Sequence, residues 1–427
     1  MSRKRSLKIL MPSVPDQRWS CRLCGRCCCE LVEHLTDEER RRIDRQGWGD
    51  SLGAAPYVRI GKSIVLNKRD NGACVFLDEK TKRCRIHERF GERAKPAACR
   101  IYPFFVRDVP QGWQVSWRFD CPGIAASRGA PMSDYLPLLN ELTRTLGHEG
   151  ATGDDCPQIV PGIRATEDET RMIIDRLVGW FEDRSQTMRH RMIGAASLTA
   201  TLSQADYTNV REDRMAELVG LLLEAVRCDD HQSQDDPPSP TQRGLLRELA
   251  FAHAEHVTIA DMNAGFFQRT TRKLSQVRAA RRFRLGVGAV PAIPGFDGGV
   301  DFTAVERVQP MCSDKDTKSV ESLIIRFVCQ RLKARSVFGY GYYGWPMFLG
   351  LMAFWVSIAA AGWLARVHAA TAGRSSLIYE DVFEGLRIAD RSAGRSPTLG
   401  TRAERLRLKY LADDDGLIKL LHHYALV

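Results

Sequence analysis

The sequence lacks the short motifs of several common enzyme mechanisms. It contains no phosphate-binding Walker loop and no His-Glu-x-x-His zinc-protease helix. These absences argue against the usual ATPase and zinc-protease mechanisms. The sequence also has no internal repeat and nothing that resembles an RNA-recognition or helix-turn-helix signature, so nucleic-acid binding is not the expected function.

The amino terminus lacks the pattern of an export signal. The basic residues Arg3, Lys4 and Arg5 are followed only by the short segment 7–11 before Pro12. A signal peptide needs a longer apolar core and a cleavage site with small residues. We therefore expect a cytoplasmic protein in a reducing environment, where clustered cysteines more often bind metal or do redox work than form disulfides.

Cysteine, by contrast, is abundant and concentrated at one end of the chain. Of 13 cysteines, nine lie between residues 21 and 121, and five of these lie within residues 21–29. Thiolates are the ligands that soft and borderline metals prefer, and a Cys-x2-Cys step lets a turn direct two sulfurs at one ion, about 2.3 Å from each. With Cys29 set aside, the expected metal ligands are Cys21, Cys24, Cys27, Cys28, Cys74, Cys84, Cys99 and Cys121.

Eight thiols are compatible with more than one kind of centre. Adjacent side chains generally leave the backbone in different directions, so Cys27 and Cys28 are not expected to share one tetrahedral ion. Two four-cysteine zinc sites, or one iron–sulfur cluster with a further ion, fit this number of ligands. A thiol redox sensor that uses Cys29 as the uncoordinated reactive thiol is a third interpretation.

The excess positive charge lies in the same part of the chain. Residues 1–125 contain 25 Lys and Arg against 15 Asp and Glu, whereas the remainder contains 37 of each. We expect this excess to offset the charge of coordinating thiolates; nucleic-acid binding and a solvated basic surface are the alternatives. The arginines expected in this role are Arg22, Arg26, Arg83, Arg85 and Arg100.

The length of 427 residues exceeds that of a single hydrophobic core, so two or three structural units are expected. The predicted fold is mainly α, with a small α+β cysteine-rich metal-binding domain at the amino terminus and a helical carboxy-terminal region. The predicted boundaries are a basic tail at 1–16, the metal-binding domain at 17–125, a helical region at 126–228, a linker at 229–242 and a second helical region at 243–427.

Local patterns predict the elements of the cysteine-rich part. Thr36, with Glu39 three positions later, forms a capping box that opens a helix ending near Gln46. Residues 57–67 alternate as in a hairpin, and the segments that begin at Cys74 and Cys84 are typical of short strands. We therefore expect small β elements and turns to carry the thiols.

Amphipathic patterns predict helices at 133–147, 167–185, 205–228, 243–283 and 318–334. A Gly-x-Gly-x-x-Gly at 339–344 does not follow a strand, and it is expected to form an aromatic-rich turn and not a nucleotide site. Residues 336–365 carry no charged side chain, and 347–365 is long enough to span a bilayer. We expect a buried core helix there, with a membrane span as the alternative.

The cysteine pattern also resembles a known family. The motifs are Cys21-x2-Cys24-Gly-x-Cys27-Cys28, Gly72-Ala-Cys74-Val-Phe-Leu77, Cys84-Arg-Ile-His87 and Lys95-Pro-Ala-Ala-Cys99-Arg-Ile-Tyr-Pro103. Over residues 17–125 they resemble the CxxCxxCC cysteine-cluster family of zinc- or iron-chelating domains, which includes flagellin lysine N-methylases with a helical region after the cluster.

This resemblance implies a zinc or iron–sulfur centre. It also implies a candidate activity, which is S-adenosylmethionine-dependent methylation of exposed lysines on a protein substrate. The sequence identifies no catalytic residue for such a reaction. The alternative function is that of a non-enzymatic interaction module whose cysteines form structural zinc sites.

Overall fold

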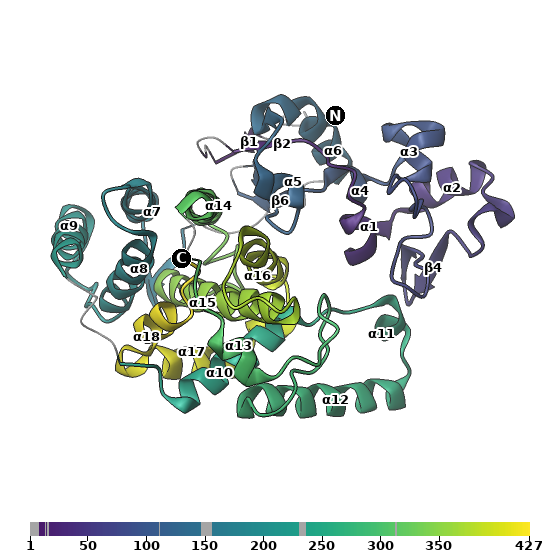
Figure 1. Ribbon diagram of the computed structural model, residues 1–427. Helices are drawn as coiled ribbons and strands as arrows, with labels where there is room; N and C mark the ends of the chain where they lie inside the picture. Colours follow the sequence, from purple (N-terminus) through teal and green to yellow (C-terminus); the bar gives the residue numbers. More distant parts are fainter. Residues whose placement is uncertain are drawn as a thin grey trace.

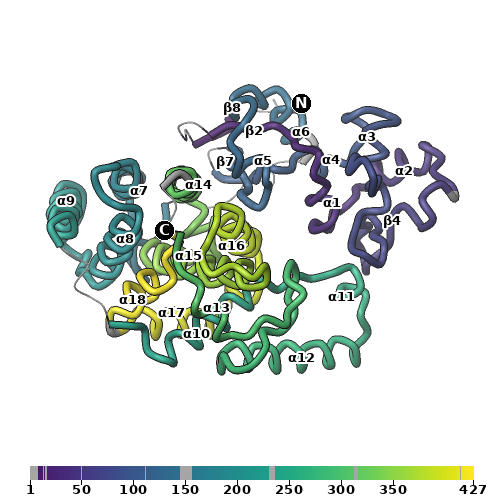
Figure 2. Tube along the Cα trace, viewed as in Figure 1, coloured from purple at the N-terminus to yellow at the C-terminus, as the bar shows by residue number. Residues whose placement is uncertain are grey.

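The computed structural model describes residues 8–12, 14, 17–110, 112–146, 156–229, 236–311 and 314–427. Helices make up 58% of the structure and the sheets are small, so the predicted fold class, mainly α with a small α+β amino-terminal part, is confirmed. Figure 1 shows the purple cysteine-rich segment at one end of the molecule, beside a larger body of packed helices. The tube in Figure 2 follows the same chain path.

Short strands and helices build the cysteine-rich end. One antiparallel sheet has the strand order β3-β5-β4, with β3 at His34–Leu35, β4 at Tyr57–Ile60 and β5 at Ser63–Leu66. The predicted hairpin is therefore confirmed, and Gly61 supplies the positive φ of +58° that its turn needs. Helix α2 (Asp37–Arg45) begins with the predicted capping box of Thr36 and Glu39.

The elements that carry the thiols differ from the prediction. Cys27, Cys28 and Cys29 lie in helix α1 (Arg26–Glu30), and Cys99 lies in α4 (Ala97–Ile101). Cys84 was predicted to start a strand, but it is the cap of helix α3 (Arg85–Phe90) and joins the preceding segment by one β-bridge. Helices of one or two turns are too short to show a periodic pattern in the sequence, which explains the error.

A second sheet links the cysteine-rich end to the helical body. Strands β6 (Phe104–Val109) and β7 (Gly112–Trp117) are antiparallel, and β1 (Lys8–Leu10) pairs in parallel with β7. The prediction of a loose basic tail is thus wrong for residues 8–10, because their backbone groups pair with those of β7. The neighbouring elements are β2 (Arg18–Trp19), α5 (Pro122–Ala126), β8 (Ala130–Pro131) and α6 (Leu136–Leu146).

Helix α15 (Met347–Thr371) forms the centre of the helical body. It packs against α16 (Tyr379–Ser392), α10 (Pro240–Ala254), α8 (Met188–Ser203) and α18 (Gly416–His423). This helix is long and apolar enough to cross a bilayer, yet 89% of its most apolar window is buried inside the protein. A Cβ added at Gly362 would stand 2.0 Å from the carbonyl oxygen of Tyr424, so its small residues serve close helix packing.

Several of the remaining helices lie where amphipathic patterns predict them, namely α7 (Glu167–Glu182), α9 (Glu212–Cys228), α11 (Ile259–Asn263), α12 (Phe266–Leu285) and α14 (Asp314–Lys333). No pattern predicted α13 (Phe302–Arg307), α17 (Arg402–Ala412), α16 or α18. A small hairpin joins β9 (Gln158–Val160) to β10 (Ile163–Arg164). Helix α8 was not predicted, because its buried residues surround the helix axis and leave no single apolar face. Residues 230–235 of the predicted linker lie outside the described residues. The prediction is wrong for its last three residues, because α10 already begins at Pro240 with Ser239 as its cap.

The segment 339–344 forms the predicted turn. The Gly339 N–H donates to the carbonyl oxygen of Trp345 over 2.8 Å, and the Tyr342 N–H donates to that of Gly339 over 2.9 Å. The ring of Tyr342 is buried against Trp345, with ring centroids 5.4 Å apart.

The described residues pack into two hydrophobic cores. The small core surrounds the thiols and consists of Leu35, Ile43, Trp48, Leu52, Ile64, Leu66, Ala73, Cys74, Val75, Phe76, Leu77 and Ile86. The buried residues of the large core run from Phe104 onward and include β6 and β7 as well as the helical body, and Ile9, Met11 and Trp19 pack against them. The predicted domain boundary at residue 125 stays a prediction.

Candidate metal centre

Five cysteines line one cavity of about 60 Å³ in the small core. Cys27 and Cys28 come from α1, Cys74 follows the β4–β5 hairpin, Cys84 caps α3 and Cys99 comes from α4. The rest of the wall consists of Leu31, Glu33, Leu66, Lys68, Phe76, Ile86, Lys95, Pro96 and Tyr102. Thiols that are far apart in the sequence thus face a single space.

The backbone around α1 explains how two adjacent cysteines reach the same cavity. Gly25, with a φ of +71°, turns the chain immediately before the helix. Successive residues of an α-helix are about 100° apart around its axis, so Cys27 and Cys28 can face one space. The neighbouring Cys28 thiol is the largest cause of the raised pKa of Cys27, so the two side chains lie close together. The Cys74 N–H donates to the Cys28 carbonyl oxygen over 2.9 Å. Both thiols therefore line one cavity, and the expectation that they do not share one tetrahedral ion stays a prediction.

The other three predicted ligands lie outside this cavity. Cys21 and Cys24 are exposed on the segment before α1. The pKa of the Cys21 thiol is raised first by desolvation and then by the charge of Cys27, so these two sulfurs are near each other. Cys121 is buried in the large core at the start of α5, where burial raises its pKa to about 11.

Burial favours the protonated form of the cavity thiols. It raises the pKa of Cys74 to about 11 and raises that of Cys99 well above its ordinary value. The pKa of Cys27 is raised by the neighbouring Cys28 thiol and then by burial. Ionised thiolates in this cavity therefore need positive charge beside them, which a bound metal would supply.

Lysines, and not the predicted arginines, provide the protein's own positive charge at the cavity. Lys68 and Lys95 are part of its wall. The predicted arginines lie elsewhere. Three of them form ion pairs, namely Arg26 with Glu384, Arg83 with Glu88 and Arg100 with Glu141. Arg85 donates a hydrogen bond to the Ser51 carbonyl oxygen, and Arg22 is exposed. Glu33, Lys68 and Lys95 were not predicted, because a lone Glu or Lys near a cysteine motif carries no distinctive spacing.

The described thiols surround the cavity but do not form a closed ligand shell. Every described cysteine is a free thiol. Within the described residues, no three His, Cys, Asp or Glu side chains are grouped closely enough to hold a metal ion as they stand. The donor set nevertheless suits a thiophilic metal, because sulfur ligands predominate in the wall and apolar residues shield them from water.

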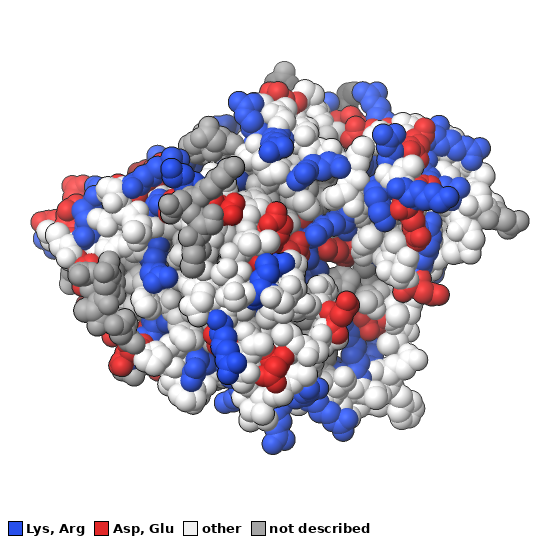
Figure 3. Space-filling model, in the orientation of Figure 1, with Lys and Arg blue, Asp and Glu red and all other residues white. Residues whose placement is uncertain are grey.

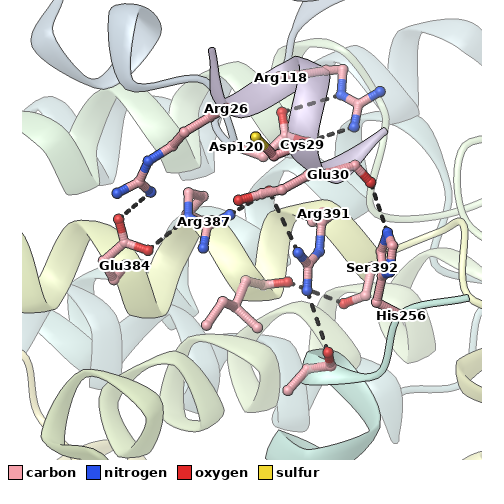
Figure 4. A network of polar contacts seen from close by, with 12 residues as sticks. Arg26, Cys29, Glu30, Arg118, Asp120, His256, Glu384, Arg387, Arg391 and Ser392 are labelled. Atoms are coloured by element: carbon pink, nitrogen blue, oxygen red, sulfur yellow. Dashed lines mark hydrogen bonds and ion pairs between the residues drawn. The ribbon is translucent and has the colours of Figure 1, made fainter. Parts of the chain in front are cut away.

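Charged residues fix α1 on helix α16 of the body, as Figure 4 shows. The Glu30 carboxylate accepts hydrogen bonds from Arg387 at 2.6 Å and from Arg391 at 3.4 Å. Arg387 also donates to Glu384 at 2.8 Å, and Glu384 pairs with Arg26. The helix that carries Cys27 and Cys28 is therefore anchored by ion pairs at both of its ends.

A histidine of the body adds a further contact to α1. The Nε2 atom of His256 lies 2.7 Å from the Glu30 carbonyl oxygen, so His256 packs against α1 and lies outside the cavity wall. His34 and His87 are exposed. The cavity wall thus holds cysteines and no histidine.

The chain was compared with known proteins. Residues 20–120 match the model of the CxxCxxCC family, described as "Putative zinc- or iron-chelating domain". An uncharacterized protein of Methanocaldococcus jannaschii is 26% identical over 106 residues, which are 23% of this chain and 54% of that protein, so the chain spans about half the length of this relative. No solved structure matches the chain significantly. Residues 20–120, which contain all five cavity cysteines, thus form a segment similar to the CxxCxxCC family, as the cysteine motifs predicted.

Proposed function

We propose that the cysteine-rich end binds a thiolate-ligated centre of more than one metal atom, an iron–sulfur cluster, in the five-cysteine cavity. The observation that carries this proposal is the number of thiols that face one space. A single tetrahedral ion takes four ligands, whereas this cavity offers five, two of them adjacent in the sequence. Cysteine thiolates are also the ligands that hold iron–sulfur clusters.

The residues of the wall have distinct roles in this proposal. Cys27, Cys28, Cys74, Cys84 and Cys99 supply the ligands, and Lys68 and Lys95 offset part of the thiolate charge. Leu66, Phe76 and Ile86 keep water away from the sulfurs. Cys21 and Cys24, on the exposed segment close to Cys27, are the next candidates for ligands if the centre extends beyond the cavity.

A structural zinc site is the second candidate. The small core has few apolar residues, and a thiolate-bound zinc would stabilise it directly. Structural zinc contributes roughly 10–16 kcal/mol of apparent binding free energy in finger peptides. This alternative makes the region an interaction module without an activity of its own.

Methyl transfer from S-adenosylmethionine to protein lysine stays a prediction from the family resemblance. The matched residues end at 120, before the helical body begins. The metal should therefore be identified first, and methyl transfer should be assayed afterwards with the metal-loaded protein.

The composition of the anaerobically purified chain decides between the two centres. The proposal expects a brown protein with broad visible absorption that is lost on oxidation, and iron and acid-labile sulfide in similar amounts, each above one atom per chain. A colourless protein that contains zinc and no sulfide would overturn the cluster and support the structural site.

Cysteine variants test the location of the centre. C74S and C99S are expected to lose most of the bound metal, because both thiols are walls of the cavity. The control is C228S, which alters an exposed cysteine at the end of α9 and is expected to keep the wild-type metal content. Equal metal content in all three variants would place the metal elsewhere.

A further inference from the structure

Helix α12 exposes a row of large apolar side chains. The exposed fractions are 79% for Phe266, 83% for Phe267, 54% for Leu274, 66% for Val277 and 63% for Leu285. Single exposed apolar residues are common on protein surfaces, but five on one helix need an explanation. We call this set the α12 stripe.

The α12 stripe points away from the protein. At about 100° per residue, its five side chains fall within an arc of about 100° around the helix axis. Phe283, the buried residue of α12, lies on the other side of the helix. There it packs on Phe251 and Trp363, with ring centroids 4.9 and 5.7 Å away.

The α12 stripe has basic residues on both sides and no acidic residue among them. Helix α12 contains seven Lys and Arg and no Asp or Glu, namely Arg269, Arg272, Lys273, Arg278, Arg281, Arg282 and Arg284. Arg272 is paired with Asp261 of α11, and the other six are exposed. By helical position, Arg269 and Lys273 lie along one side of the stripe and Arg278 and Arg282 along the other. Arg281 and Arg284 fall within its arc, in the last turn of the helix.

The position of α12 makes this surface accessible to a large flat partner. In Figure 1 the helix runs along the lower edge of the molecule, away from the cysteine-rich end. Blue Lys and Arg side chains lie along the same edge in the space-filling view of Figure 3. A helix of this length extends over about 30 Å.

These observations favour one kind of partner. A second copy of α12 would bring two strongly basic helices together, which is unfavourable. From Phe266 to Val277 the arc of the stripe contains no basic side chain, so a nucleic acid would meet apolar groups there, although phosphates require basic ones. An anionic lipid surface accepts both features, because apolar side chains enter the boundary of the acyl chains while the flanking Lys and Arg remain at the headgroups.

We propose that α12 docks the protein on an anionic membrane surface. Phe266, Phe267, Leu274 and Val277 enter the interface, and the flanking basic residues contact the lipid phosphates. The docking helix lies on the membrane and does not span it, and it is distinct from the buried apolar helix α15. This interaction goes beyond metal binding and does not depend on it.

Vesicle co-sedimentation of the full-length protein tests the proposal. Vesicles that contain phosphatidylglycerol and phosphatidylcholine are expected to bind the protein, and pure phosphatidylcholine vesicles are expected to bind it at least tenfold more weakly. Higher salt is expected to weaken the binding. No binding to the anionic vesicles at low salt would overturn the proposal.

Two pairs of variants separate a membrane from other polyanions. F266S/F267S is expected to lower vesicle affinity at least tenfold. The variant should still fold, because both rings are exposed. L274S/V277S tests the same effect further along the helix. The control is R214Q/L221S, which alters an exposed arginine and an exposed leucine on the acidic helix α9. Its vesicle affinity is expected to equal that of the wild type.

Equal vesicle affinity of the wild type and both stripe variants would contradict the role of the apolar side chains. Binding to RNA that depends on Arg278 and Arg282 but not on Phe266 and Phe267, without vesicle binding, would identify a nucleic-acid surface instead and would also overturn the proposal.

Discussion

The two hydrophobic cores of this protein are stabilised in different ways. The large core is built from helices that cover α15 on every side, and several of its contacts are between backbones. The small core contains far fewer apolar residues, and it surrounds a cavity lined by thiols. Since buried apolar area is the main source of folding free energy, we expect the helical body to be stable by itself and the cysteine-rich end to need the proposed metal.

The cysteine-rich end and the helical body are held together by charged contacts as well as by packing. The contact between them includes ion pairs between α1 and α16, with Arg387 between Glu30 and Glu384, and the packing of α4 on α6. Such pairs add little net stability compared with apolar packing, but the loss of one member is costly. The position of α1 is therefore specified by charge.

Removal of the metal is expected to have the largest effect, and it would affect only one core. The small core should lose its order, because a structural metal contributes on the order of 10 kcal/mol in small domains. Hydrogen exchange followed by mass spectrometry, with and without a chelator, would locate the change. Rapid exchange is expected over residues 34–100, and α15 and α16 should stay protected. Equal protection of both regions in the metal-free chain would show that the small core folds without metal.

Arg387→Ala is expected to have the next largest effect, because it breaks the contact between the regions. The variant removes the partner that Glu30 and Glu384 share and leaves them only Arg391 and Arg26, so the loss should be at most about 3–5 kcal/mol, the cost of breaking a buried pair. Urea unfolding of the metal-loaded protein would measure this loss. Arg83→Ala is the control, because Arg83 and Glu88 form an exposed pair at 3.9 Å, and it should cost under about 1 kcal/mol. Similar losses in the two variants would mean that the α1–α16 pairs do not hold the regions together.

The helical body is expected to depend on pH through Glu404 of α17. Burial, and then the nearby Glu248, raise the pKa of Glu404 to about 7, although Arg407 opposes this shift. Its Oε1 atom is buried and has no hydrogen-bond partner among the described residues. The folded state therefore binds a proton that the unfolded state releases near pH 4.5.

The stability from Glu404 is fully present below pH 4.5 and is lost as the pH rises to about 7. The loss should approach 1.4 kcal/mol per pH unit inside this window. Urea unfolding of the body at several pH values would measure it, and E404Q, which cannot ionise, should flatten the profile. An unchanged slope in E404Q would assign the pH dependence to other groups.

Backbone packing in the large core is expected to give the smallest of these effects. Gly362→Ala would force a methyl group against the Tyr424 carbonyl oxygen and should destabilise the body by about 1–3 kcal/mol. Gly179→Ala is the matched control in α7, where an added Cβ meets nothing within 4 Å, and it should stabilise the helix by about 0.5–1 kcal/mol. Thermal unfolding measures both, and a neutral Gly362→Ala would indicate that α15 and the carboxy-terminal segment can move apart.

Sequence reasoning was most successful where the signal is local. The capping box of Thr36 and Glu39, the hairpin at Gly61 and the aromatic-rich turn at 339–344 depend on a few consecutive residues, and the structure contains all three. Short helices at Cys27 and Cys99 were missed because they contain too few residues for a periodic pattern. Helix α8 was missed for the opposite reason, since it is buried on all sides.

Long-range features of the site could not be predicted. The ion pairs of Glu30 with Arg387 and Arg391 join residues more than 350 positions apart, and no local pattern marks them. The same holds for Lys68 and Lys95, which contribute to the cavity through tertiary packing. Arginines near the cysteines were expected there, but several of them pair with carboxylates elsewhere.

The sequence by itself determined the side-chain chemistry of this protein, because the residue types supply the clustered thiols, and its periodic patterns indicated the longest helices. The tertiary structure alone decided which five thiols share a cavity, that α15 is buried inside the body, and that the α12 stripe faces outward. The physical reason is that side-chain chemistry and helical period are properties of neighbouring residues, whereas convergence and burial depend on how distant segments pack.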